Sequence, residues 1–362
     1  MDITMNKFRP ALLMTICCGA LLFALLAAAQ GTEWEALNRE ALSLYRQGQY
    51  ARAETVARKA VEAAERKFGP SHPNVASSLN NLALFHEKQG RYADAEPFIR
   101  RSLAIWEKAL GPNHPDVATA LNNLALLRKK QGRYADAEPL YRRSLAIDEK
   151  VHGPNHPEVA TDLNNLATLY MAQDRYADAE PLFRRSLAIW EKALGPDHPG
   201  VASSLNNLAL LRKKQGRYAD AEPLYRRSLA IDEKVHGPNH PEVATDLNNL
   251  ATLYMAQDRY ADAEPLFRRS LAIWEKALGP DHPDVASSLN NLAALYQAMG
   301  RYADAEPLYQ RALSIREKTF GSHHPYVVQS LNNLANLYTA TGRSKEAEAL
   351  ARRVEEIRKV KR

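Results

Sequence analysis

The sequence is built on a repeat of 42 residues. The dipeptide His-Pro recurs with this spacing, beginning at His72, His114, His156, His198, His240, His282 and His324. The motifs Asn-Asn and Arg-Tyr-Ala-Asp-Ala-Glu-Pro recur in phase with it. A fixed period of about 20 to 50 residues is typical of stacked supersecondary units, each of which packs only against its neighbours. We therefore expect one continuous repeat array rather than several independent domains.

Each repeat predicts two helices joined by a turn. In the unit that begins at His198, Pro199 suits the first turn of a helix, where its missing N–H is not needed. The apolar residues that follow keep helical spacing on one face, and Gly216 ends this helix. The second helix must begin near Tyr218, because Pro223 deep inside a helix would cost about 3 kcal/mol or more.

The two ends of the array depart from the repeat in a way that is typical of capping units. Glu40 stands where later units have leucine, and Ala349 replaces the repeated proline. Stacked arrays need polar outer faces on their terminal units to stay soluble. We therefore divide the array into an N-terminal capping repeat (30–71), six 42-residue repeats (72–323), and a C-terminal repeat with a capping helix (324–362).

Residues 1–29 differ from the rest of the chain. Two basic residues precede an apolar run that ends in three alanines, a pattern typical of a secretory signal peptide. This pattern predicts an exported protein, periplasmic or secreted. The alternative is an uncleaved membrane anchor, because 11–29 is close to the lower length limit of a spanning helix. Cys17 and Cys18 both lie in this segment, so cleavage would leave a chain without thiol or disulfide chemistry.

The array also has a longer period. Residues 114–197 and 198–281 differ only at Asp116/Gly200, Thr119/Ser203 and Ala120/Ser204. This near-copy of 84 residues indicates the duplication of a block of two repeats. Units that are copied as interchangeable pieces favour an extended surface over a single catalytic centre.

The repeated motifs resemble those of a known family. The unit contains the strings "HPxVAxxLNNLA" and "GRYADAEPLYRRSLAI", and the characteristic positions are Leu208, Ala209, Gly216, Tyr218, Ala221 and Tyr225. At these spacings the unit resembles a tetratricopeptide repeat, and its 42-residue length is similar to the variant of kinesin light chains and their prokaryotic relatives. The resemblance implies an all-α fold, a right-handed α-solenoid superhelix. It also implies that the first helices line a concave groove that binds peptides or partner proteins.

The paired asparagines are the first candidate binding residues. The resemblance places the first Asn of each pair on the concave side: Asn80, Asn122, Asn164, Asn206, Asn248, Asn290 and Asn332. An amide both donates and accepts hydrogen bonds, so a row of them could bind the main chain of an extended peptide. The alternative is that these residues tie neighbouring helices together, an interpretation that we favour for the second Asn of each pair.

A second candidate group lies one helical step further along the groove. Alternate units carry two lysines, and the units between them carry a methionine: Lys129, Lys130, Lys213 and Lys214, against Met171 and Met255. Basic positions separated by apolar ones predict a partner that is acidic and carries hydrophobic residues. The alternative is a solvated helix end with ordinary surface lysines.

Several other functions are disfavoured. The net charge of +6 is not concentrated in clusters with stacking aromatic residues, so we expect no nucleic-acid partner. Membrane contact is expected only if the N-terminal segment stays uncleaved. The His-Pro histidines are better explained as helix caps than as ligands, and we expect no metal or cofactor. No nucleophile with an adjacent base and no phosphate-binding glycine loop occurs in the sequence, so we expect no enzymatic activity.

These observations predict an exported scaffold that binds a peptide or partner protein in its concave groove. The alternative is a structural spacer whose repeat number sets its length and which makes contacts through its ends.

Overall fold

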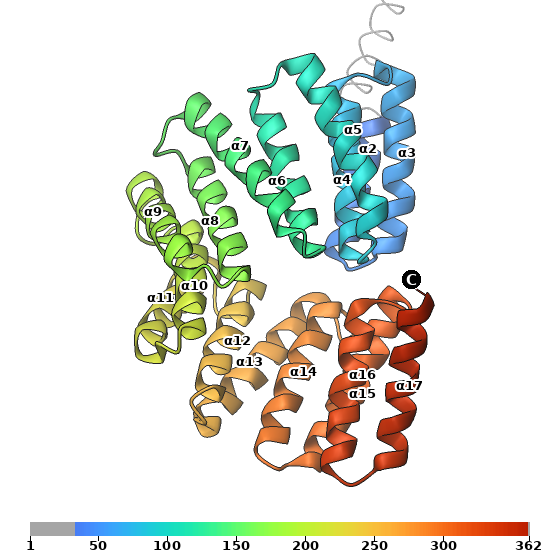
Figure 1. Ribbon diagram of the computed structural model, residues 1–362, viewed down its shortest axis with the longest axis vertical. Helices are drawn as coiled ribbons and strands as arrows, with labels where there is room; N and C mark the ends of the chain where they lie inside the picture. Colours follow the sequence, from blue (N-terminus) through green and yellow to red (C-terminus); the bar gives the residue numbers. More distant parts are fainter. Residues whose placement is uncertain (1–32, 361–362) are drawn as a thin grey trace, which may run out of the picture.

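A computed structural model describes residues 33–360 of the chain, and within them the regular structure is entirely helical. Consecutive helices pair into units (Figure 1). The first helices are α2 (Glu33–Arg46), α4 (Pro73–Lys88), α6 (Pro115–Lys130), α8 (Pro157–Ala172), α10 (Pro199–Lys214), α12 (Pro241–Met255), α14 (Pro283–Ala298) and α16 (Pro325–Ala340). The second helices are α3 (Tyr50–Phe68), α5 (Tyr92–Leu110), α7 (Tyr134–His152), α9 (Tyr176–Leu194), α11 (Tyr218–His236), α13 (Tyr260–Leu278), α15 (Tyr302–Phe320) and α17 (Ser344–Val360). The predicted signal peptide or anchor at 1–29 lies outside the described residues.

The His-Pro dipeptide starts each first helix from α4 onward. The imidazole Nδ1 of His198 accepts a hydrogen bond of 3.0 Å from the backbone N–H of Gly200, and the other six histidines cap their helices in the same way. This bond satisfies one of the backbone donors that a helix start leaves free. The predicted capping role of these histidines is confirmed.

The second helix of each unit begins a few residues before the repeated proline, as the sequence predicts. Helix α11 starts at Tyr218, and Pro223 lies just beyond its first turn with its side chain exposed. Only the hydrogen bond to the carbonyl of Ala219 is lost at this position. The same arrangement recurs in α5, α7, α9, α13 and α15, so the predicted boundary holds in every unit that carries the proline.

A buried serine joins the two helices of a unit. Ser228 of α11 is fully buried, and its hydroxyl donates to the carbonyl oxygen of Ala202 in α10 at 2.9 Å. Ser102, Ser144, Ser186 and Ser270 make the same bond in their own units. A buried hydroxyl without a partner would destabilise the core, so this bond explains how a polar residue is tolerated there.

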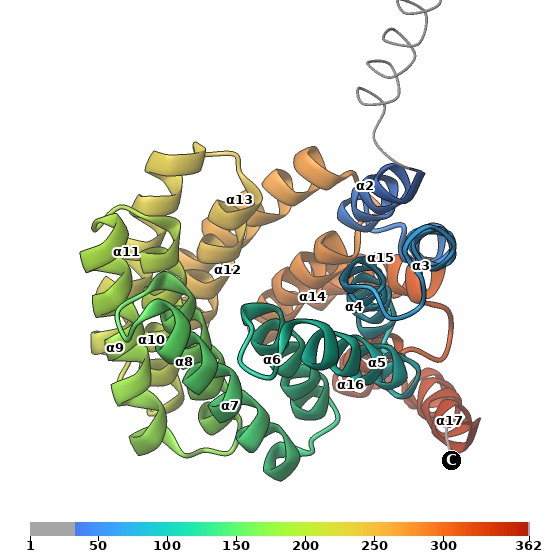
Figure 2. The ribbon, with the colours of Figure 1, turned by 90° about the horizontal axis from the view of Figure 1, so that it is seen from above.

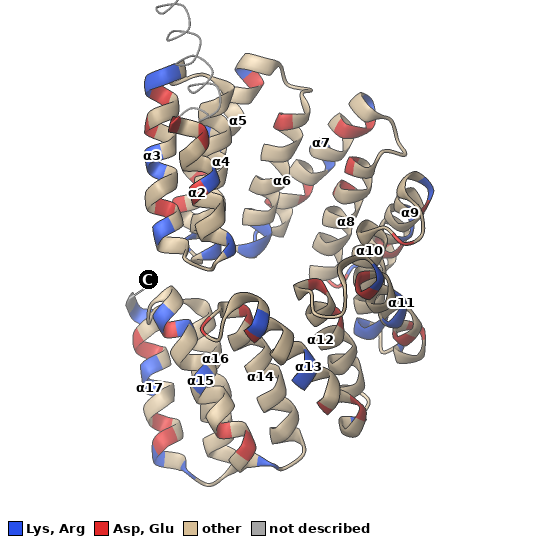
Figure 3. Ribbon diagram, turned by 180° about the vertical axis from the view of Figure 1, so that it is seen from behind, with Lys and Arg blue, Asp and Glu red and all other residues tan. Residues whose placement is uncertain are grey.

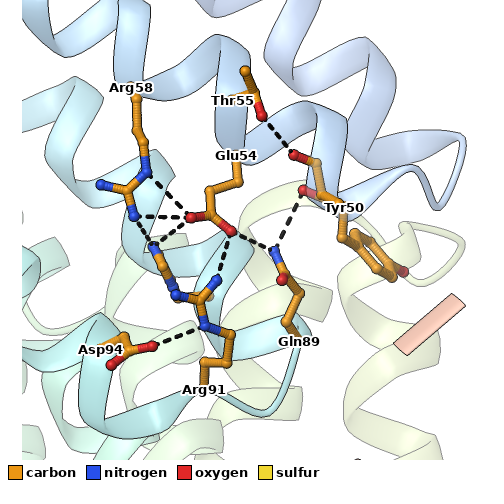
Figure 4. A network of polar contacts seen from close by, with 9 residues as sticks. Tyr50, Glu54, Thr55, Arg58, Gln89, Arg91 and Asp94 are labelled. Atoms are coloured by element: carbon orange, nitrogen blue, oxygen red, sulfur yellow. Dashed lines mark hydrogen bonds and ion pairs between the residues drawn. The ribbon is translucent and has the colours of Figure 1, made fainter. Parts of the chain in front are cut away.

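The Arg-Tyr-Ala-Asp-Ala-Glu-Pro motif holds neighbouring units together. In Figure 4 the carboxylate of Glu54, the equivalent residue in α3, accepts hydrogen bonds from Arg58, from Gln89 at 3.1 Å and from Arg91 at 2.8 Å. These partners keep the pKa of Glu54 below its ordinary value although burial opposes this. The motif glutamates of later units contact the next unit in the same manner, as Glu222 does with the hydroxyl of Tyr254 and the guanidinium of Arg259 at 2.9 Å.

The units form about one turn of a superhelix. Seen from above, the first helices lie on the inside and the second helices on the outside (Figure 2). The turn brings the C-terminal units back against the N-terminal ones, so that the start of α3 contacts the end of α15, where Tyr50 stacks on Phe320 (Figures 1 and 2). Glu40 is exposed on the first helix, as predicted for a capping unit. Among the described helices, none has the length and apolar character needed to cross a membrane.

Candidate peptide-binding face

The candidate site is the inner face, which we define as the exposed and half-buried side chains of the first helices α4 to α16. The Asn pairs lie in the middle of these helices, and most of them are half-buried. Figure 3 shows that α6, α8 and α14 carry charged residues mainly near their ends, whereas charges of both signs alternate along α3 and α17. The centre of the inner face is therefore formed mostly by neutral polar and apolar side chains.

The asparagines form a ladder along this face. The second Asn of each unit donates from Nδ2 to Oδ1 of the first Asn in the preceding unit. The bond is 2.8 Å from Asn123 to Asn80, 3.0 Å from Asn207 to Asn164 and 2.7 Å from Asn291 to Asn248. The alternate bonds, to Asn122, Asn206 and Asn290, are longer at 3.3–3.5 Å. The ladder gives the second Asn a structural role, and it occupies the acceptor of the first Asn.

The donor groups of the first asparagines alternate between two states. Nδ2 of Asn122 donates to Asp162, Nδ2 of Asn206 donates to Asp246, and Nδ2 of Asn290 donates to the carbonyl oxygen of Ala286 at 3.1 Å. In the other units Nδ2 makes no hydrogen bond to any residue of the described part of the chain: Asn80, Asn164, Asn248 and Asn332. These open donors are spaced by 84 residues, the length of the duplicated block.

For Asn122 and Asn206 the closed state has a cause in the sequence of the next unit, whereas Asn290 donates within its own helix and also lies 3.5 Å from Oγ of Ser330. Forty residues after Asn122 and Asn206, the chain places Asp162 and Asp246 within reach of the amide. At the equivalent distance from Asn80 the chain has Ala120, which offers no side-chain acceptor. Serines stand at this place after Asn164 and Asn248, and their hydroxyls make no bond to the amide.

The lysines divide into two kinds. Lys129 is half-buried, and its Nζ donates to Oγ1 of Thr168 in the next unit at 2.8 Å; Lys213 bonds Thr252 in the same way at 2.9 Å. Burial lowers the pKa of Lys129 to about 8 and lowers that of Lys213 in the same direction. Lys130 and Lys214 are exposed. The exposed lysines are therefore the more accessible members of each pair, although Lys130 also lines a cavity beside Lys88 and Asp284.

The methionines lie partly in the core. Met171 packs against the buried cluster that includes Leu169 and Phe183, and Met255 packs against the cluster that includes Leu253. Both methionines are half-buried. Their side chains thus support the inner face and contribute only part of their surface to it.

A pair of buried carboxylates was missed by the sequence analysis. Asp148 at the end of α7 is 6% exposed and Asp162 in α8 is 1% exposed. Burial raises the pKa of Asp162 to about 7 and raises that of Asp148 as well. The hydroxyl oxygen of Ser144 lies 3.3 Å from Oδ1 of Asp162, and His152 lies 3.9 Å from Asp148.

The duplicated block contains a second pair, Asp232 and Asp246, where burial raises the pKa of Asp246 to about 8. The sequence carries a signal for these pairs. Asp148 and Asp232 stand at the position occupied by Trp106, Trp190 and Trp274 in alternate units. Within residues 33–360 no group of three or more His, Cys, Asp or Glu is arranged to hold a metal ion.

Comparison with known proteins identifies the family. The tetratricopeptide repeat profile matches residues 35–84, 75–150, 116–170, 159–234, 203–255, 242–318 and 284–359. No curated protein sequence matches the chain.

Three solved structures with similar folds match this chain over most of their own length. BtubC (BKLC) from P. vanneervenii is 25% identical, covers 65% of this chain and 92% of its own, and superposes with a TM-score of 0.50. Nearly identical repeats of a kinesin light chain-like protein from Podosopora anserina are 27% identical, covering 57% and 97%, with a TM-score of 0.47. Aspartyl phosphate phosphatase F from Bacillus subtilis is 13% identical, covers 90% and 93%, and has a TM-score of 0.57, a likeness of fold alone.

The helix pairs and the matched profile agree with the α-solenoid expected from the repeat. The chain belongs to the tetratricopeptide repeat family.

Proposed function

We propose that this chain is a scaffold that binds an extended segment of a partner protein along its inner face. Proteins of the tetratricopeptide repeat family generally act in protein–protein interaction and are generally not enzymes. The observation that carries the proposal is the row of open amide donors at Asn80, Asn164, Asn248 and Asn332. The main-chain carbonyl oxygens of an extended segment are the acceptors that such a row would bind.

The asparagine ladder supports this role by fixing the open donors in place. Because Oδ1 of Asn164 accepts a bond of 3.0 Å from Asn207, the orientation of its amide is set before any partner arrives. A donor that is already oriented loses little conformational entropy when it binds. The units that alternate with these contribute ladder bonds and no open donor, because Asn122 and Asn206 use their donors within the protein.

The exposed lysines indicate the chemistry of the partner. Lys130 and Lys214 lie at the ends of α6 and α10, and no carboxylate bonds to either of them within the described residues. Acidic side chains of a bound segment would complement them. Half-buried Met171 and Met255 offer apolar surface in the units between. We therefore propose an acidic segment that also carries hydrophobic residues.

The alternative function, a spacer that makes contacts through its ends, requires ends that are free and far apart. The rings of Tyr50 in the first unit and Phe320 in the seventh stack with centroids 5.9 Å apart. Because the first unit contacts the seventh, the array coils back on itself and does not extend, which favours binding on the inner face over spacing.

A peptide-library selection with the purified chain tests the proposal. The test variant carries Asn80→Ala, Asn164→Ala and Asn248→Ala, which removes three open donors. The control variant carries Asn122→Ala, Asn206→Ala and Asn290→Ala. Both variants remove three ladder acceptors, so they differ in whether the lost donor was open.

The proposal predicts that peptides enriched by the wild-type chain are acidic, bind the control variant and fail to bind the test variant. Melting temperatures of both variants show whether the helices remain folded. Equal binding by the wild-type chain and the test variant, or the absence of any enriched peptide, would refute the role of the open donors.

We further propose that the protein acts after export, as residues 1–29 suggest. N-terminal sequencing of the protein from its native cells tests this directly, since retention of the first residue would exclude cleavage.

A further inference from the structure

The ends of the superhelix meet along a seam, which we define as the contact of the turns at Gly48 and Gly90 with the helix starts at His282 and His324. A Cβ atom added to Gly48 would lie 2.9 Å from His282, and one added to Gly90 would lie 2.6 Å from His324. The equivalent glycines in other units, such as Gly132, have no atom of another element within 4 Å of that position. The two contacts have the same register, because each joins residues that are 234 positions apart in the sequence.

The residues of the seam are more deeply buried than the equivalent residues of the other units. His282 is 7% exposed and His324 is 6% exposed, whereas the capping histidines of the other units are half-buried or exposed. Burial lowers the pKa of His282. Pro283 is buried, unlike the prolines that start the other first helices. These residues are thus covered because the first units pack against them.

Aromatic residues bridge the seam. The rings of Tyr45 and Tyr50 lie 5.6 Å apart, Tyr50 stacks on Phe320, and Phe320 contacts Tyr326 at 5.6 Å between centroids. Phe320 stands where the repeats 72–281 have Leu or His, although the first unit has Phe68 there. Tyr326 stands where the repeats 72–323 have Asn, Asp, Glu or Gly. Aromatic pairs of this kind stabilise a contact beyond the area that they bury. The sequence of the last unit therefore departs from the repeat at the seam, where Tyr326 replaces a polar residue or glycine.

Charged groups of both signs line a cavity of about 270 Å³ within the seam. Lys88 and Glu87 come from α4, and Asp284 comes from α14. Burial opposes a charged Lys88, but Glu87 on the same helix raises its pKa most, and Asp284 across the seam adds to this effect. Basic residues gather at the ends of α4 and α6 on the side that faces the C-terminal half (Figure 3). Attraction across the seam thus adds to the aromatic contacts.

We infer that the first two and last two units form a clasp that holds the superhelix closed as a ring, and that the clasp opens before any unit unfolds. In a repeat array each unit otherwise packs only on its neighbours in the sequence. The seam is therefore the main contact between the first two units and the last two. The inference concerns shape and does not depend on the proposed binding function.

Substitution of Gly90 tests the clasp, and Gly132 provides the matched control. Both glycines have positive φ, +69° and +74°, so Gly90→Gln and Gly132→Gln strain their turns alike. Only the side chain at position 90 would meet His324. A second variant, Tyr326→Asn, restores the residue that the chain itself has at position 74.

The readout is the rate at which diethyl pyrocarbonate modifies each histidine, together with the maximum dimension from small-angle X-ray scattering. In the wild-type chain and in Gly132→Gln, His282 and His324 should react more slowly than His114, and the maximum dimension should be that of the closed ring. In Gly90→Gln and Tyr326→Asn both histidines should react as fast as His114, the maximum dimension should increase and helicity should be unchanged. Equal reactivity of His324 and His114 in the wild-type chain, or equal behaviour of the two glycine variants, would overturn the inference.

Discussion

The buried carboxylate pairs should make the protein less stable as the pH rises. Asp162 and Asp246 are each 1% exposed, and burial raises their pKa values to about 7 and about 8. The folded state therefore keeps these protons at pH values where the unfolded chain, with an ordinary Asp pKa near 3.9, has lost them. Stability falls with pH wherever the folded state binds more protons. The decrease begins near pH 4 and ends near pH 8.

The magnitude follows from the same values. Raising the pKa of a carboxyl from about 3.9 to about 7 lowers the free energy of unfolding by about 4 kcal/mol at pH values above both pKa values. Roughly 2 to 4 kcal/mol of this loss per pair falls between pH 5 and pH 8. In the next repeat the residue equivalent to Asp162 is Ser204, whose hydroxyl lies 3.2 Å from that of Ser186. We therefore expect Asp162→Ser with Asp246→Ser to be tolerated and to remove most of this pH dependence.

The assay is chemical denaturation followed by far-UV circular dichroism at pH 5, 6, 7 and 8. The control is Asp178→Ser with Asp262→Ser, which removes two carboxylates that are about half exposed on the surface. Each variant is compared with the wild-type chain at every pH, so the comparison isolates the buried carboxylates from the other groups of the chain. A serine variant that loses stability with pH as steeply as the wild-type chain, or a control that loses the dependence, would refute the reasoning.

Three further predictions concern the contacts that build the array, each measured as the change in the free energy of unfolding. Glu222→Gln weakens the charge-assisted bonds to Arg226 and Arg259 and should cost about 1–2 kcal/mol, against no change for exposed Glu242→Gln. Ser228→Ala leaves the carbonyl of Ala202 without this bond and should cost about 1 kcal/mol; a neutral result would show that the hydroxyl is dispensable. His198→Ala removes the cap at the start of α10 and should cost about 1 kcal/mol, a value that His198→Asn should largely restore.

Much of the fold could be predicted because the sequence repeats its local chemistry. His198 and Pro199 fix the start of a helix through a bond between residues two apart, and Pro223 limits where the next helix begins. Such short-range constraints can be read from one unit and hold in the others. The packing of one unit on the next follows from the same periodicity.

The details of the site could not be predicted in this way. The availability of the Asn164 donor depends on the residue that lies forty positions further on, and a motif read within one unit does not contain that contact. Asp148 and Asp162 come from different helices, so their proximity appears only when the helices are packed. The seam depends on the small rotation added by every unit, because only the sum determines whether Gly48 meets His282.

The most direct test of the proposed function is the response of individual asparagine side chains to a bound peptide. With a selected acidic peptide, ¹H–¹⁵N spectra of selectively labelled asparagine report each Nδ2 group. The account predicts that the signals of Asn80, Asn164 and Asn248 shift on binding, while those of Asn122 and Asn206, which already donate to Asp162 and Asp246, stay in place. Shifts of equal size at all five residues, or none at the first three, would contradict it.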